Sequence, residues 1–113
     1  MTRVYLPSTL DRLRVLLDTG AHPATTDGVL AEGDDEASEY AAVMTAADAS
    51  AELLAGAGRR VVVVAEVADP DAAVPIADVV SVLADPTDRP AGADPDEDLA
   101  WFATQEIADL LAR

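Results

Sequence analysis

Residues 61–67 read VVVVAEV, and this stretch decides the fold. β-branched side chains favour extended backbone, and a continuous apolar run of this length is typical of a strand buried on both faces. Gly56 and Gly58 precede the run and Asp69-Pro70 follows it, so turn-forming residues bound it on both sides. The sequence therefore predicts a strand in the middle of a sheet.

Two shorter apolar runs predict neighbouring strands. Residues 3–6 read RVYL, and Pro7 is expected to end that strand because proline cannot donate to a strand ladder. Residues 79–83 read VVSVL and stop before Asp85-Pro86. We expect the first of these strands to lie beside the central one, with the second beside either of them.

Residues 10–19 have the periodicity of a helix. Leu10, Leu13 and Leu17 fall on one face, Ser8 or Thr9 can cap the N-terminus, and Gly20 stands where a helix C-cap is expected. The stretch that follows is ambiguous. Residues 22–26 fit either an edge strand or a loop.

Asp34 and Asp35, followed by Glu36, are expected to open a second helix that runs to about Ala55. We expect one stripe to contact the sheet, namely Tyr40, Met44, Ala47, Ala51 and Leu54. The opposite face carries Ala41, Ala42, Ala46 and Ala49. Small residues would permit close approach by a second copy of the chain, although alanine is also a strong helix former.

Residues 84–97 contain three prolines and indicate a loop. A third helix, capped by Asp96 or Asp98, is expected to continue to about Leu111. Its apolar face would consist of Leu99, Phe102, Ala103, Ile107, Leu110 and Leu111. Glu106 falls inside this face and Trp101 points away from it.

Together these elements predict an α/β fold. We expect one domain over residues 1–113, with a small mixed sheet of three to four strands packed with three helices. The expected order is β-α-(β)-α-β-β-α.

The two ends of the chain are distinctive. Residues 3–10, RVYLPSTL, and 101–107, WFATQEI, resemble the opening and closing segments of a family of small uncharacterised actinobacterial proteins. The closing segment of that family reads W-[YF]-A-T-Q-E-I. The middle also fits at residues 33–36 (GDDE), 39–42 (EYAA) and 60–63 (RVVV). Many members are longer around residues 21–32 and 68–78. The resemblance implies a domain of unknown function, and it brings no activity and no catalytic residue.

The charge balance limits the partners. The chain has 22 Asp and Glu residues, seven Arg and no Lys, for a formal net charge of −15. Such a surface repels phosphate, so we expect no nucleic acid and no anionic membrane as partners. Neither a signal-like nor a membrane-spanning apolar segment is visible, and we expect a cytoplasmic protein. The absence of cysteine excludes disulfide and thiolate chemistry.

No pattern points to catalysis, a metal or a cofactor. His22 is the single histidine, and we expect it to be an exposed bystander because it precedes Pro23 in a predicted loop. Residues 94–98 read DPDED and alternate like a calcium loop. Leu99 and Gln105, however, replace the glycine and the bidentate glutamate that such a loop needs. We therefore interpret these acids as the start of the third helix.

Glu106 is the one carboxylate placed in an apolar stripe. It would pair with Arg3, Arg59 or Arg60, take up a proton, or keep its head group in water at the margin. We favour the last alternative. The candidate binding residues are Trp101, Gln105, Glu106, Arg3, Arg59 and Arg60.

Three functions stay open. The favoured one is a non-enzymatic acidic protein-interaction or regulatory domain, with a protein partner or a homodimer, because Trp101 and the alanine-rich helix face lack an obvious role in the core. The second is a small-ligand binder or enzyme centred on Glu106, Gln105 and an arginine. The third is an acidic nucleic-acid mimic that binds a basic protein.

Overall fold

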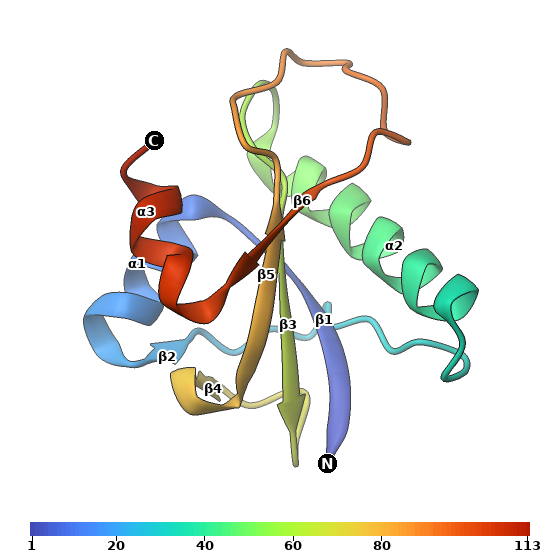
Figure 1. Cartoon of the computed structure of the whole chain (residues 1–113), viewed down its shortest axis with the longest axis vertical. Coiled ribbons are helices and arrows are strands. Elements are labelled where there is room, and N and C mark those ends of the chain that lie inside the picture. The colour runs from blue at the N-terminus through green and yellow to red at the C-terminus, as the bar shows by residue number, and fades with distance from the viewer.

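Four strands form an antiparallel sheet in the order β1-β3-β5-β6, as seen in the computed structural model of residues 1–113 (Figure 1). The sheet strands are β1 (Thr2–Ser8), β3 (Val61–Val67), β5 (Val79–Ala84) and β6 (Ala100–Ala103). The helices are α1 (Leu10–Thr19), α2 (Glu36–Leu54) and α3 (Ile107–Leu111). Short strands β2 (Ala21–His22) and β4 (Val74–Pro75) pair with each other, and 3₁₀ turns occupy Ile76–Asp78 and Thr104–Glu106. The expected α/β class and element order are confirmed, whereas the sheet, expected to be mixed, is antiparallel throughout.

The central position of β3 is confirmed. Its register joins Val63 to Leu6 of β1 on one side and to Val82 of β5 on the other. All three of these residues are fully buried. β1 therefore lies beside the central strand as predicted, and β5, whose place the sequence left open, lies on its other side.

β1 continues through Pro7 to Ser8, so the prediction that Pro7 ends it is wrong. The backbone of Tyr5 bonds outward, to Val29 rather than to β3. Bonding direction alternates along a strand, so the position of Pro7 also faces outward and needs no amide donor. Thr9 then caps α1, because its Oγ1 accepts from the amide of Arg12 at 3.2 Å.

The outer edge of β1 is covered by the segment around Val29. Tyr5 and Val29 exchange two backbone hydrogen bonds of 2.9 Å each. Gly28 makes this approach possible, because a Cβ at that position would lie 2.7 Å from Val4 Cγ2. The predicted ambiguity at residues 22–26 resolves into loop after the two residues of β2.

The two faces of the sheet are covered differently (Figure 1). On one face, α1 and α3 contribute the fully buried Leu13, Leu16, Ile107 and Leu110. On the other face, α2 packs through small residues over Tyr5 of β1 and over Val62 and Val64 of β3. The side chains that α2 buries are Ala42, Ala46, Ala47 and Ser50.

The predicted orientation of α2 is therefore wrong. Tyr40 is 53% exposed and Ala51 is exposed, whereas Ala42 and Ala46 lie against the sheet. Small side chains let the helix axis approach the sheet closely, and Tyr5 fills the space that they leave. Half of the alanine-rich face, Ala42 and Ala46, is thus used inside the fold, whereas Ala41 is exposed and Ala49 is half-buried.

Ser50 joins α2 to the end of the β1–β3 ladder. Its Oγ donates to the Ser8 carbonyl at 2.8 Å and accepts from the Val61 amide at 2.8 Å. Ser8 and Val61 are register partners, so the hydroxyl stands between two groups that face each other across the strands.

We expect Ser50→Ala to lower the free energy of unfolding by about 2–3 kcal/mol, because a buried donor and a buried acceptor both lose their partner. Denaturant titration measures the change. Thr45→Ala is the matched control, because Thr45 lies on the exposed side of the same helix and should change stability by less than about 0.5 kcal/mol. Equal losses in both variants would contradict the bridging role of Ser50.

The C-terminal segment differs most from the prediction. The expected long helix is wrong: residues 100–103 form β6, and only residues 107–111 are α-helical. Leu99 packs toward the α2 side of the sheet and Phe102 toward the other side, which is the period-two alternation of a strand. The acids at residues 94–98 consequently lie in a loop and do not begin a helix.

Candidate functional site

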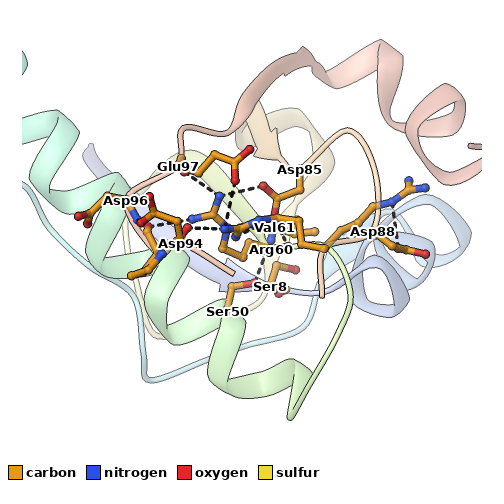
Figure 2. Close-up of polar contacts among 12 residues, drawn as sticks. Ser8, Ser50, Arg60, Val61, Asp85, Asp88, Asp94, Asp96 and Glu97 are labelled. Atoms are coloured by element: carbon orange, nitrogen blue, oxygen red, sulfur yellow. Dashed lines mark hydrogen bonds and ion pairs between the residues drawn. The ribbon is translucent and has the colours of Figure 1, made fainter. Parts of the chain in front are cut away.

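Arg60 and Asp85 form an ion pair in the interior, at the end of the sheet where β3 begins and β5 ends (Figure 2). Their side chains are 2% and 3% exposed. Arg60 Nε and Nη2 donate to the two carboxylate oxygens at 2.9 and 2.8 Å, and the Arg60 amide donates to Oδ2 at 2.8 Å. The hydrogen bonds that the Arg60 side chain donates to Asp85 raise the pKa of Arg60. This bidentate geometry satisfies both charges.

Arg60 also fixes the loop between β5 and β6. Its Nη1 donates to the Pro95 carbonyl at 3.1 Å and its Nη2 to the Glu97 carbonyl at 2.7 Å. Arg89 binds the same loop through the carbonyl of Asp94, and its backbone pairs with Gly58. The two arginines thereby hold the loop that leads into β6.

The other two candidate arginines lie elsewhere. Near the start of β1, Arg3 Nη2 donates to Glu66 Oε1 of β3 at 2.9 Å. This hydrogen bond raises the pKa of Arg3. Arg59 is 9% exposed and donates to the carbonyl of Leu110 in α3 and to that of Arg113, two residues after α3. Asp88 lies 3.3 Å from Arg59 Nε.

Glu106 does not meet any of these arginines. It is exposed, and its Oε1 accepts from the amide of Ala103 at 2.9 Å. Gln105 is exposed as well. The favoured placement of Glu106, with its head group in water at the margin of the core, is confirmed. The candidate residues therefore occupy separate regions and form no common pocket.

Trp101 lies in the middle of β6, at the edge of the sheet, and 63% of it is exposed. It stands opposite Leu83 of β5, on the face that α2 covers mainly over β1 and β3. The acids that flank β6 in the chain are all exposed, and they are Asp96, Glu97, Asp98, Glu106 and Asp109. A large aromatic surface is thus presented to solvent on a strongly acidic part of the chain.

Two surface cavities exceed 300 Å³. One, of about 330 Å³, lies between the start of α1 and the end of α2, where Arg14 and Arg59 face Asp11 and Asp88. The other, of about 320 Å³, adjoins the beginning of β6. Its lining includes Asp85, Arg89, Glu97, Asp98 and Ala100.

His22 is fully buried, so the prediction of an exposed bystander is wrong. Its Nδ1 lies 2.9 Å from the Pro23 carbonyl, which can only accept, so we assign the proton to Nδ1. Nε2 then accepts from the Ser8 hydroxyl at 2.7 Å. A serine and a histidine are paired, but both are fully buried, and neither lines the two large cavities. The pair therefore has a role in packing.

Burial lowers the pKa of His22 below its usual value of 6.5. Below that pH the unfolded chain takes up a proton that the folded chain resists, so the free energy of unfolding should fall as the pH is lowered through this range. Chemical denaturation at several pH values between neutrality and mild acid measures the slope. His22→Gln keeps one donor and one acceptor but cannot titrate, and its slope should be shallower. Identical slopes in the two proteins would contradict this account.

Comparison with known proteins gives one match. A family of unknown function, DUF6912, matches residues 2–111. The chain belongs to this family. No curated protein and no solved structure matches the chain. Membership in the DUF6912 family covers both ends of the chain, including β1 and β6, and assigns no activity.

The structure of this DUF6912 member contains neither a helix that could span a membrane nor a cluster of side chains that could hold a metal ion. None of its helices combines the length and apolarity required to cross a membrane. No group of three or more histidine or carboxylate side chains is arranged to hold a metal ion.

Several functional candidates escaped the sequence analysis. Asp85 stands before Pro86, and this dipeptide indicates the end of a strand. It gives no sign of the ion pair with Arg60. The buried position of His22 had no sequence signal either, because its partner Ser8 is distant in the chain. The strand character of β6 did have one, since two aromatic residues follow a proline-rich loop and precede Thr104, a typical helix-capping residue.

Proposed function

We propose that this protein is a non-enzymatic interaction domain that binds a positively charged segment of another protein, with Trp101 as the anchor. The observation that carries the proposal is the position of Trp101. An indole that is 63% exposed leaves a large apolar area in water, and tryptophan is the residue type most enriched among interface residues that dominate binding energy.

The charge of the chain favours a basic partner over a second copy. Two copies would each bring a formal charge of −15 to the interface, and like charges oppose association. The alanine-rich face of α2 suggested self-association, but Ala42 and Ala46 of that face are buried against the sheet. A partner rich in Lys and Arg would instead be attracted by the exposed acids before and after β6.

The other two functions receive less support from the geometry. An enzyme centred on Glu106 would need an arginine beside the carboxylate, whereas Glu106 bonds the backbone of Ala103. A nucleic-acid mimic would need its carboxylates along one face. Exposed acids instead lie on α1 and α2, which cover opposite faces of the sheet.

The proposal is tested by affinity capture from native cell extract with two matched baits, the wild-type chain and Trp101→Ala. We expect the wild-type bait to retain a basic protein at low salt, with release at high salt as the charges are screened. The Trp101→Ala bait should retain at least about tenfold less of it. The purified partner should reproduce both effects in a direct titration.

Trp101→Ala should fold like the wild type, because the side chain lies largely in solvent and its loss leaves no cavity in the core. Circular dichroism and the melting temperature serve as the control. Equal capture by the two baits, or capture that is insensitive to salt, would contradict the proposal.

A further inference from the structure

The two edge strands of the sheet differ in whether another segment of the chain pairs with them. At the β1 edge, Tyr5 and Val29 exchange both backbone hydrogen bonds, so that edge is blocked over its middle. At the β6 edge, no backbone–backbone hydrogen bond joins residues 100–103 to a segment beyond the sheet, and the Ala103 amide bonds only the side chain of Glu106. Exposed edges are the places where an added strand pairs with a sheet.

The direction of the free groups on β6 follows from Glu106. The Ala103 amide donates to the carboxylate of Glu106, so it faces away from β5. Bonding direction alternates along a strand, so the amide and carbonyl of Trp101 also face away from β5. The strand registers extend this alternation from β6 through β5 and β3 to β1, where it predicts that the Tyr5 backbone faces outward. The two hydrogen bonds between Tyr5 and Val29 agree with that direction. The exposed indole and the free backbone thus belong to the same residue.

We infer that the partner adds to β6 as an extended basic segment, pairing with the Trp101 backbone and packing an apolar side chain on its indole. This inference rests on the proposed function and names its mode of binding. Pairing through backbone groups supplies affinity, and alternate side chains supply specificity.

Charge at both ends of β6 selects a basic occupant. The 320 Å³ cavity at the Ala100 end contains the exposed carboxylates of Glu97 and Asp98 beside Arg89, and a basic side chain of an added strand would reach it. At the other end, Glu106 occupies the Ala103 amide and limits how far the added strand can extend. A second copy of the chain would bring its own acids to these positions.

The test uses a short synthetic peptide of alternating Arg and Val, with a Glu and Val peptide as the charge control. Affinity is measured by calorimetry at low salt, and hydrogen exchange is followed at the Trp101 amide by NMR. We expect only the Arg peptide to bind, and the Trp101 amide to exchange at least about tenfold more slowly in the complex. The Tyr5 amide, which already has a partner, should be unchanged.

Backbone methylation of the peptide separates pairing from side-chain contact. One peptide carries N-methyl groups on every Arg and another on every Val, and only one set of amides can face β6. Pairing predicts that one methylated peptide binds at least about tenfold more weakly than the other.

Binding of the Arg peptide with an unchanged Trp101 amide, or equal affinities of the two methylated peptides, would overturn strand addition and leave the proposed function standing. Failure of the Arg peptide to bind would overturn both. Sedimentation that shows a dimer of the chain, with slowed Trp101 exchange in the absence of peptide, would overturn the choice of occupant.

Discussion

Replacing Arg60 with alanine is expected to lower the free energy of unfolding by about 3–5 kcal/mol. The substitution leaves the Asp85 carboxylate 3% exposed and without its bidentate partner. Asp85 keeps the backbone amide of residue 60 and Arg89, whose Nη1 lies 3.6 Å from Oδ2. A buried carboxylate that has lost its bidentate partner is nevertheless far less favourable than the same charge in water, which explains the size of the effect. The carbonyls of Pro95 and Glu97 lose their donors as well.

Denaturant titration of Arg60→Ala beside Arg14→Ala measures this effect. Arg14 forms an ion pair with Asp11 that is exposed to solvent, and its loss should change stability by no more than about 1 kcal/mol. NMR of the loop between β5 and β6 should show that Arg60→Ala also disturbs the start of β6. A loss below about 1 kcal/mol in Arg60→Ala would show that the pair does not organise this end of the sheet.

The substitution Val63→Asp is expected to abolish folding. Val63 is fully buried in the middle of the central strand, between Leu6 and Val82. A carboxylate there has no partner on the α1 and α3 side of the sheet, and its burial would remove most of the stability of a domain of this size.

Circular dichroism and NMR test this prediction. The control is Val80→Asp, because Val80 lies on neighbouring β5 but is 42% exposed, and we expect that variant to remain folded. A folded, soluble Val63→Asp protein would contradict the central placement of β3.

The parts of the fold that could be predicted are those with a strong local pattern. The valine run of β3 predicts a buried strand. The leucines of α1, together with Thr9 and Gly20, predict a short capped helix. The apolar run of residues 3–6 also predicted β1 beside β3, whereas the sequence left the place of β5 open and the strand register decides it.

The errors arose where two periodicities overlap or where composition hides a pattern. In residues 99–111, Ile107 and Leu110 belong to a helix, while Leu99, Trp101 and Phe102 follow the alternation of a strand. A single helical projection places most of these residues on one face, so it predicts one long helix where the chain forms a strand and a short helix. Alanine on nearly every side of α2 left no contrast, so the sequence could not show which face meets the sheet.

The candidate site was predictable only in part. The departure of Trp101 from the helical stripe predicts a side chain outside the core, and Trp101 is exposed, although on a strand and not on a helix. The sequence suggests Arg60 as a partner for Glu106, whereas the partner of Arg60 is Asp85 at the end of β5. Such pairings depend on the register of strands and on the path of loops, which composition and spacing do not encode.

The intrinsic fluorescence of Trp101 tests the central claim most directly, because the chain has a single tryptophan. In the free protein its emission should resemble that of tryptophan in water. On titration with the captured basic partner at low salt, the account predicts a saturable shift to shorter wavelength that high salt reverses. Partner binding that leaves the emission of Trp101 unchanged would contradict it.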